Sequence, residues 1–212
     1  MSAAERVAIF IDGASFARIT YEGLGIRVDF KRLLAALSGE RILTHAIYYL
    51  GEWIDDGRDV ERRRAQQLGF IRMLNRNGYR VVRKPTHALA DGSLRVDIGL
   101  ELAIDMLALA DRCDRAILVS GDPEFAPLVR AVAAKGSRVV VVGSQLTSAF
   151  NSTPEFPRVF PARVGDELLD AADEFVEVRD LVAQIEFVEA RRGARPFVPI
   201  APNAPLEPSE DD

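Results

Sequence analysis

The chain has 212 residues, of which 48% are hydrophobic and 28% charged, and its net charge is −5. This balance is typical of a globular protein of about one domain, and a single cysteine with two histidines excludes a disulfide framework and the usual Cys- or His-rich metal sites. No apolar run approaches the ~18 residues of a membrane span, and no signal peptide opens the chain, so we expect a cytoplasmic protein without a membrane segment.

Short apolar runs rich in β-branched residues alternate with helical patterns. Strands are predicted at 6–11, 42–50, 79–83, 116–119, 138–142 and 175–178, and helices at 29–38, 59–77, 95–111, 123–135 and 179–191. Continuously apolar strands are typical of a sheet covered on both faces, and right-handed crossovers make such strands parallel. The sequence therefore predicts a three-layer α/β/α sandwich with a mainly parallel central sheet.

Two segments fall outside this alternation. Residues 144–164 are rich in Ser, Thr and Pro and are predicted to form a long loop or added arm, either a dimer arm or a substrate lid. Residues 193–212 are rich in Pro and end in acidic residues, which is typical of a disordered tail. We therefore expect one domain over residues 1–192, with its core at about 5–180 and an insertion at 144–164.

One stretch reverses the acidic balance. Residues 58–84 hold nine basic and two acidic residues, so this segment carries +7 and the rest of the chain carries −12. A phosphate-binding surface needs such a basic face, although an ordinary solvated helix has the same pattern. The residues predicted to hold a nucleic-acid backbone are Arg58, Arg62, Arg63, Arg72, Arg76, Arg83 and Lys84.

Carboxylates follow two of the predicted strands. Asp12 comes directly after the first, and Asp122 and Glu124 lie in "SGDPEF" after the fourth. Because open α/β sheets bind ligands at the carboxyl ends of their strands, we expect these acids to meet at one edge. Each also has a local explanation, since Asp-Gly is an ordinary turn pair and Asp-Pro an ordinary helix start. Gly13 is expected to turn the chain away and leave the Asp12 carboxylate accessible.

Three more acids lie on the helix predicted at 95–111. Asp97, Glu101 and Asp105 are spaced i, i+4, i+8, which keeps them on one helix face. Asp97 is expected at the sheet edge as a ligand, and Glu101 as a supporting group. Asp105, about 12 Å further along the helix axis, is expected to pair with an arginine or to cap a backbone group.

A hard divalent cation explains why these acids gather. Carboxylates that converge without basic partners repel one another, and burying them is costly. Mg²⁺ binds one or two carboxylates, keeps several waters and binds substrate phosphates, and it activates water for attack on a phosphodiester. Ser15 and Ser120 are supporting candidates that hold water or orient a carboxylate.

Four motifs resemble the NYN domain family, the LabA-like branch of the PIN-like nuclease superfamily. They are "FIDGAS" at 10–15, "RVDIGLELAIDMLALA" at 95–110, "AILVSGDPEFAPLVRAVAAKGSRVVVVG" at 116–143 and "LLDAADEFVEV" at 168–178. Their order and spacing match the family over roughly residues 5–180. The resemblance implies a PIN-like fold and ribonuclease activity that depends on Mg²⁺ or Mn²⁺.

The resemblance also implies a set of site residues. By position, Asp12, Asp97 and Asp122 match the acidic metal site, Glu124 stands where a further catalytic aspartate is usual, and Asp105 matches a recurring acid.

The chain departs from the family pattern at three places. Ser15 replaces an asparagine, Leu94-Arg95 replaces Lys-Gly, and Pro123-Glu124 replaces Ser-Asp. The three principal aspartates remain, so the departures put the strength of turnover in question rather than the presence of the site.

Two hypotheses follow. The first is a metal-dependent ribonuclease that hydrolyses RNA phosphodiester bonds, preferably in single-stranded or looped RNA, whose bases are accessible. The second is a catalytically weak or inactive NYN domain that binds RNA as a regulatory protein. A homodimer is considered for either. Haloacid-dehalogenase-like chemistry is weaker, because it needs an acid two residues after Asp12, where Ala14 stands.

Overall fold

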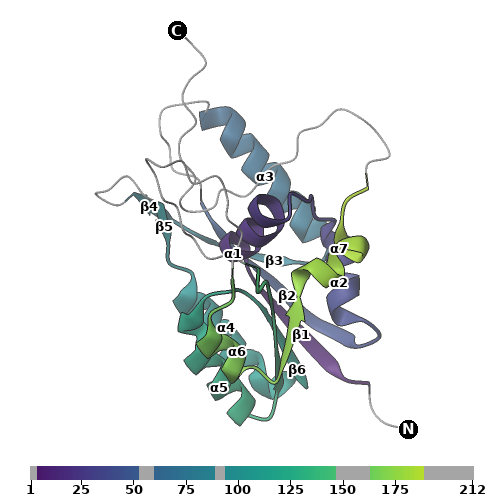
Figure 1. Ribbon diagram of the computed structural model, residues 1–212. Coiled ribbons are helices and arrows are strands. Elements are labelled where there is room, and N and C mark those ends of the chain that lie inside the picture. Colours follow the sequence, from purple (N-terminus) through teal and green to yellow (C-terminus); the bar gives the residue numbers. More distant parts are fainter. Residues whose placement is uncertain (1–3, 53–59, 89–93, 147–162, 189–212) are drawn as a thin grey trace.

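A six-stranded, fully parallel sheet runs through the centre of the molecule in the order β3-β2-β1-β6-β7-β8 (Figure 1). The structure is a computed structural model that describes residues 4–52, 60–88, 94–146 and 163–188. The strands are β1 (Arg6–Asp12), β2 (Ile42–Gly51), β3 (Arg80–Lys84), β6 (Arg115–Val119), β7 (Arg138–Gly143) and β8 (Glu174–Glu177). A separate antiparallel ribbon joins β4 (Thr86–Ala88) to β5 (Leu94–Val96).

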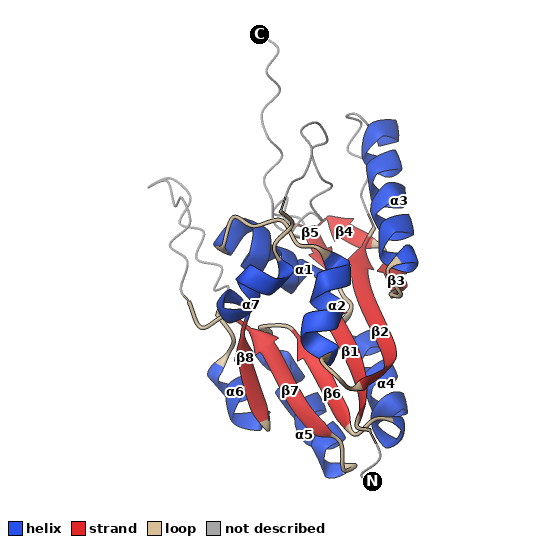
Figure 2. Ribbon diagram, turned by 90° about the vertical axis from the view of Figure 1, so that its right-hand side faces the viewer, coloured by secondary structure: helices blue, strands red, loops and turns tan. Residues whose placement is uncertain are grey.

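Helices cover both faces of the sheet, which confirms the predicted three-layer sandwich. One face carries α1 (Gly13–Ala17), the π-helical η1 (Arg18–Gly23), α2 (Phe30–Ser38), α3 (Val60–Arg76) and α7 (Val178–Ile185). The other carries α4 (Gly99–Leu109), α5 (Ala126–Ala134) and α6 (Asp166–Ala171), with the 3₁₀ turns η2 (Ala110–Arg112) and η3 (Pro123–Phe125). Figure 2 shows α4, α5 and α6 behind the sheet and α1, α2 and α7 in front of it. No helix within the described ranges is long and apolar enough to cross a membrane.

The central strand β1 is buried on both sides. Val7, Ile9 and Ile11 pack into the core under α2 and α7, whereas Ala8 and Phe10 pack into the core under α4 and α5. The side chains of a strand alternate between its two faces. Helices cover both faces here, so all five side chains are fully buried. The residue at the carboxyl end of β1, Asp12, is therefore held in the middle of the sheet.

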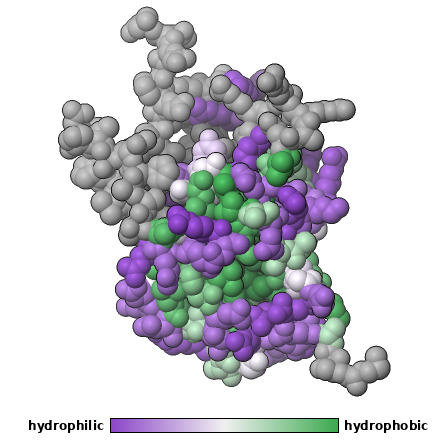
Figure 3. Space-filling model, turned by 45° about the vertical axis from the view of Figure 1, so that its right-hand side comes forward, coloured by the Kyte–Doolittle hydropathy of each residue, from purple (hydrophilic) through white to green (hydrophobic). Residues whose placement is uncertain are grey.

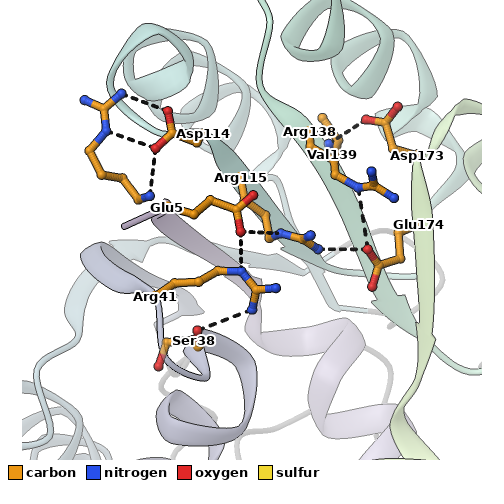
Figure 4. A network of polar contacts seen from close by, with 10 residues as sticks. Glu5, Ser38, Arg41, Asp114, Arg115, Arg138, Val139, Asp173 and Glu174 are labelled. Carbon is orange, nitrogen blue, oxygen red and sulfur yellow. Dashed lines mark hydrogen bonds and ion pairs between the residues drawn. The ribbon is translucent and has the colours of Figure 1, made fainter. Parts of the chain in front are cut away.

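Arginines neutralise the acids at the opposite, amino-terminal edge of the sheet (Figure 4). Arg115, at the start of β6, makes ion pairs of 3.5 Å with Glu5 and 2.8 Å with Glu174. Arg6 holds Asp114 at 3.0 Å and, through this hydrogen bond, lowers the pKa of that carboxyl to about 2. These ion pairs connect the starts of β1, β6 and β8, so the charged residues at this edge stabilise the sheet.

Two predicted helices have different ends in the structure. The helix predicted at 95–111 begins only at Gly99, because residues 94–96 pair with β4 as a strand. The helix predicted at 179–191 ends at Ile185, because Glu186 bridges to Val28 in extended conformation. In both places a tertiary backbone pairing overrides the local helical pattern.

The predicted loop and tail lie mostly outside the described residues. This applies to 147–162 and to 189–212, so the expected insertion, tail and domain limits stay predictions. The short helix α6 directly after the predicted loop was not expected from the sequence.

Gly13 is the residue at which the packing around β1 tolerates no side chain. A Cβ there would lie 2.5 Å from Cε1 of the Tyr48 ring and 2.5 Å from the carbonyl oxygen of Tyr49. The expectation that Gly13 keeps Asp12 accessible is wrong, since Asp12 is only 6% exposed. Gly13 instead allows the turn to approach β2 closely.

Gly13→Ala is expected to lower the free energy of unfolding by about 1–3 kcal/mol, because the new methyl group meets a backbone oxygen that cannot move aside. Gly69→Ala is the matched control, since a Cβ at this helical position meets nothing within 4 Å. It should stabilise the protein by about 0.5–1 kcal/mol. Urea unfolding of both variants measures the difference, and equal stability of the two would contradict the close approach at Gly13.

Candidate active site

Asp12 ends β1 and caps the helix that follows it. Its Oδ1 accepts hydrogen bonds from the backbone N–H groups of Ala14 and Ser15, both at 3.1 Å, and the Ser120 hydroxyl donates to Oδ2 at 3.0 Å. A carboxylate offers about four acceptor positions, so one remains. Asp12 is thus both a helix cap and a buried carboxylate with capacity for one more partner.

The environment of Asp12 disfavours its charged form. Burial raises the pKa of its carboxyl, and the nearby Asp122 adds to this rise. The hydrogen bonds from Ser15 and Ser120 and the positive charge of Arg18 act in the opposite direction without cancelling it. A bound cation would favour the charged carboxylate here, since a nearby positive charge offsets desolvation.

Four of the predicted acids line one pocket of about 790 Å³ between α1, α4 and α5. They are Asp12, Asp97, Asp122 and Glu124, from three separate segments of the chain. Within the described ranges, the carboxylates of Asp97 and Glu124 make no hydrogen bond or ion pair, and Asp122 accepts only from the Glu124 N–H at 2.9 Å. The structure therefore gathers these acids, as predicted, and among the described residues none of them forms an ion pair with an arginine or lysine, although the charge of Arg18 in the same pocket acts on Asp12.

Two serines join the ends of β1 and β6. Ser120 donates to Asp12 and accepts a hydrogen bond from the Asp122 N–H at 3.2 Å. The Ser15 hydroxyl accepts from the Gly121 N–H at 2.9 Å. Both side chains are buried, so they hold the two acidic turns in a fixed relation.

Glu101 and Asp105 lie outside this pocket. Lys84 forms an ion pair with Glu101 and lowers the pKa of that carboxyl through the hydrogen bond. Asp105 pairs with Arg80 and accepts a hydrogen bond from the Tyr49 hydroxyl at 2.8 Å, as expected for its distance from the sheet edge.

The prediction that Asp97 shares a helix face with Glu101 and Asp105 is wrong, because Asp97 precedes α4. Its position directly before the helix still places it on the pocket wall, beside the start of α4.

The donor set fits a hydrated hard cation rather than a closed cage of ligands. Within the part of the chain that the structure describes, no three Asp, Glu, His or Cys side chains lie close enough together to hold a metal as they stand. Mg²⁺ is commonly bound through one or two carboxylates and several waters, and a pocket lined by unpaired carboxylates meets that need.

The basic residues of β3 are already paired with acids. Arg83 lies 3.6 Å from Glu52, and Lys84 binds Glu101. These contacts link β3 to the end of β2 and to α4. Nucleic acid would have to compete with them for both cations.

The predicted basic helix is present as α3, with Arg62, Arg63, Arg72 and Arg76 along it. Arg58 lies outside the described residues. Arg72 and Arg76 are exposed and have no ion pair with any described residue. The same holds for Arg64, so these three arginines of α3 are exposed and without an ion pair to the described residues, and each is able to bind a phosphate.

Sequence reasoning missed Arg18, the first residue of η1. Arg18 lines the acidic pocket and also an adjoining one of about 410 Å³ that contains Arg163. Its guanidinium has no hydrogen bond or ion pair with any residue in the described ranges. The sequence feature that could have indicated Arg18 is its spacing from Ala14. Residues at i and i+4 of a helix share a face, so a helix that begins beside Asp12 brings both residues to the same side.

Comparison with known proteins agrees with this arrangement. The family model of the NYN domain matches residues 6–179. This chain belongs to the NYN domain family. The family is part of the PIN-like superfamily, so the resemblance stated from the motifs is confirmed.

Two relatives cover nearly the whole NYN domain. The low amplitude and bright protein LabA of Synechococcus elongatus is 26% identical over 201 residues, 91% of this chain and 92% of that protein. A crystal structure of a Vibrio parahaemolyticus protein of unknown function is 25% identical, with a TM-score of 0.63, and the match covers 84% of this chain and 96% of that one. The structural match shows that this chain and the Vibrio protein share a fold over most of their lengths.

Asp12→Asn is expected to stabilise the protein at neutral pH in the presence of a chelator. The pKa of Asp12 is raised in the folded state, so its contribution to stability is fully present below the unfolded pKa and is lost as the pH rises through the folded one. The difference in free energy of unfolding between Asp12→Asn and the wild type should therefore grow as the pH rises, by about 1.4 kcal/mol for each unit by which the pKa is shifted.

Thermal unfolding between about pH 4 and pH 8 measures this dependence. Asp114→Asn is the opposite control, because Arg6 lowers the pKa of Asp114. That variant should lose stability at neutral pH, and its loss should shrink as the pH falls toward the native pKa of about 2. A pH-independent effect of Asp12→Asn would contradict the buried, raised-pKa carboxyl.

Proposed function

We propose that this NYN domain is a divalent-metal-dependent ribonuclease that hydrolyses RNA phosphodiester bonds in the acidic pocket. The observation that carries the proposal is the gathering of Asp12, Asp97, Asp122 and Glu124 around one pocket, where no described arginine or lysine forms an ion pair with them. Membership of the NYN family supports the same class of chemistry. Acids with no structural neutralisation at a ligand-binding edge are best explained by a cation and a phosphate.

The residues divide into three roles. Asp12, Asp97 and Asp122 would hold Mg²⁺ or Mn²⁺, which supplies water activation and charge stabilisation when bound. Glu124 accepts a proton from the attacking water, whose oxygen forms the new bond to phosphorus while the bond to the ribose oxygen breaks and that oxygen takes up a proton from solvent. Arg18 holds a non-bridging phosphate oxygen, since a guanidinium offers two parallel donors to phosphate. Ser120 keeps the Asp12 carboxylate in orientation.

The basic helix α3 supplies the remaining contacts to the substrate. Arg62, Arg63, Arg72 and Arg76 hold the backbone of unpaired RNA, with Arg58, Arg83 and Lys84 extending the same surface in sequence. Backbone contacts of this kind are sequence-independent, so the helix orients the strand without selecting its bases. A homodimer and a cytoplasmic location stay predictions.

A second candidate function is RNA binding without cleavage, as a regulatory protein. The observation that favours it is the lack of a preformed three-ligand cluster among the described residues. Ser15 and Glu124 also stand where the family pattern has other residues. Binding that needs no divalent ion, with no cleavage under Mg²⁺ or Mn²⁺, would establish this alternative.

Asp122→Asn is expected to reduce cleavage of single-stranded RNA in Mg²⁺ or Mn²⁺ by more than about 100-fold. Loss of groups that merely orient a metal ligand costs about 10–100-fold, and Asp122 is proposed as a ligand itself. The amide oxygen still caps the turn at Glu124, so the fold should persist. Asp111→Asn is the matched control, because Asp111 is an exposed acid paired with Lys135. Equal cleavage by wild type and Asp122→Asn would end the assignment.

Arg18→Gln is expected to lower kcat by about 100-fold with a smaller change in KM, because a donor aimed at developing phosphate charge acts mainly in the transition state. Arg18→Lys should recover part of the rate, since it keeps the charge but loses the paired donors. Arg130→Gln, an exposed arginine on α5, controls for net charge. An unchanged kcat for Arg18→Gln would exclude the phosphate contact.

A further inference from the structure

A second pocket, of about 500 Å³, lies on the other side of the helix formed by α1 and η1. Ala14 and Arg18 face the acidic pocket, whereas Phe16, Ala17 and Thr20 line this one. Its remaining walls come from α2, α3, β2, the segment 26–29, Tyr21 and Phe187, and they include two charged residues, Arg27 and Asp29. The proposed nuclease chemistry uses none of the residues of this second pocket.

The walls of the pocket are aromatic. The ring of Phe30 stands edge-on to Phe16 at 6.4 Å, to Tyr48 at 5.8 Å and to Phe70 at 5.4 Å, measured between ring centroids. Figure 3 shows hydrophobic side chains gathered in the middle of the face that it draws, with hydrophilic ones around them. Aromatic walls of this kind suit a flat ring that stacks or packs edge-on.

Tyr48 brings a polar group without a protein partner to this pocket. Its side chain is 1% exposed, and its hydroxyl makes no hydrogen bond with the described residues. The other two buried tyrosines are satisfied, because Tyr79 donates to the Phe30 carbonyl at 2.9 Å and Tyr49 donates to Asp105. The hydroxyl is not one of the fully buried, unpartnered polar atoms among the described residues, so it keeps some accessible surface. Its donor is complementary to an acceptor on a ligand.

The rim of the pocket carries amides and a cation. Gln66 and Asn77 of the α3 side line the opening, and the Asn77 amide donates only to the sulfur of Met73, a weak acceptor. Gly69 forms part of the same wall. At 100° per residue Arg76 lies within about 20° of Gly69 around the helix, so its exposed guanidinium stands on the pocket side of α3.

We propose that this pocket binds one nucleobase. The ring packs among Phe16, Phe30 and Phe70, accepts a hydrogen bond from the Tyr48 hydroxyl, and places its phosphate outside, near Arg76. Flat aromatic walls with few polar groups and a neighbouring cation match the two halves of a nucleotide. The base comes from a free nucleotide or from an RNA strand, and the second source rests on the proposed function.

The test uses the full chain in the presence of a chelator, so that binding is measured without cleavage. Calorimetric titrations use AMP, GMP, CMP and UMP, a short single-stranded RNA, and ribose 5-phosphate as the ligand without a base. At least one mononucleotide or the RNA should bind more tightly than ribose 5-phosphate. Tyr48→Phe should weaken that binding about three- to tenfold, the effect of one hydrogen bond.

Gly69→Leu is the blocking variant. A Cβ at this exposed helical position meets no protein atom within 4 Å, so the leucine can start without a clash, and because Gly69 lines the pocket it should occupy the space and abolish base binding. Asp111→Asn should leave mononucleotide binding unchanged, because this exposed acid pairs with Lys135 and lines neither pocket. An effect on mononucleotides assigns the site to a free nucleotide, and an effect on RNA alone assigns it to a strand.

The proposal is overturned if ribose 5-phosphate binds as well as every nucleotide, or if neither Tyr48→Phe nor Gly69→Leu changes binding. Thermal unfolding of both variants confirms that they are folded. The titrations measure binding without hydrolysis, whereas the ribonuclease assignment is tested by RNA cleavage. The two proposals can therefore fail independently, and separate experiments show which one has failed.

Discussion

The burial of one carboxylate, Asp12, at the end of the central strand determines how the site is built. A strand packed on both faces leaves its last side chain far from bulk water, and an ionisable group there needs fixed partners. The backbone N–H groups of α1 and the hydroxyl of Ser120 supply them, so β1, α1 and β6 meet at this point. Gly13 makes the junction sterically feasible, because its missing Cβ lets the turn lie on Tyr48. Core packing thus fixes the position of the functional group.

Both edges of the sheet carry acidic side chains, but these acids have different surroundings at the two edges. At the amino-terminal edge Glu5, Asp114 and Glu174 each meet an arginine, and Arg6 lowers the pKa of Asp114. At the carboxyl edge burial raises the pKa of Asp12, and Asp97 has no cationic partner within the described residues. Charge that is neutralised within the fold stabilises it, whereas charge left open in a pocket is available to a cation. The pairing of acids, rather than their number, separates the structural edge from the functional one.

Sequence patterns predicted what depends on period and topology. The strands follow from β-branched runs, and the meeting of Asp12 with Asp122 follows from parallel strands that end at one edge. Tertiary contacts decided the rest. Residues 94–96 form a strand because β4 offers a partner, so the helix expected there starts later. Among the described residues the Arg18 guanidinium has no ion pair and the Tyr48 hydroxyl has no hydrogen bond, and a sequence alone does not show which neighbours surround a side chain.

One helix separates the acidic pocket from the aromatic one, and this has a thermodynamic consequence. Residues at i, i+4 share a helix face, so Ala14 and Arg18 turn to the acids while Phe16 and Thr20 turn to the aromatic walls. Tyr48 touches both sides, since its ring lines the aromatic pocket and packs against Gly13. A ligand that holds this ring also restrains the turn that carries Asp12. Any change that such a ligand makes in affinity at the acidic site must be matched by an equal change in its own affinity, because coupling between two sites is reciprocal.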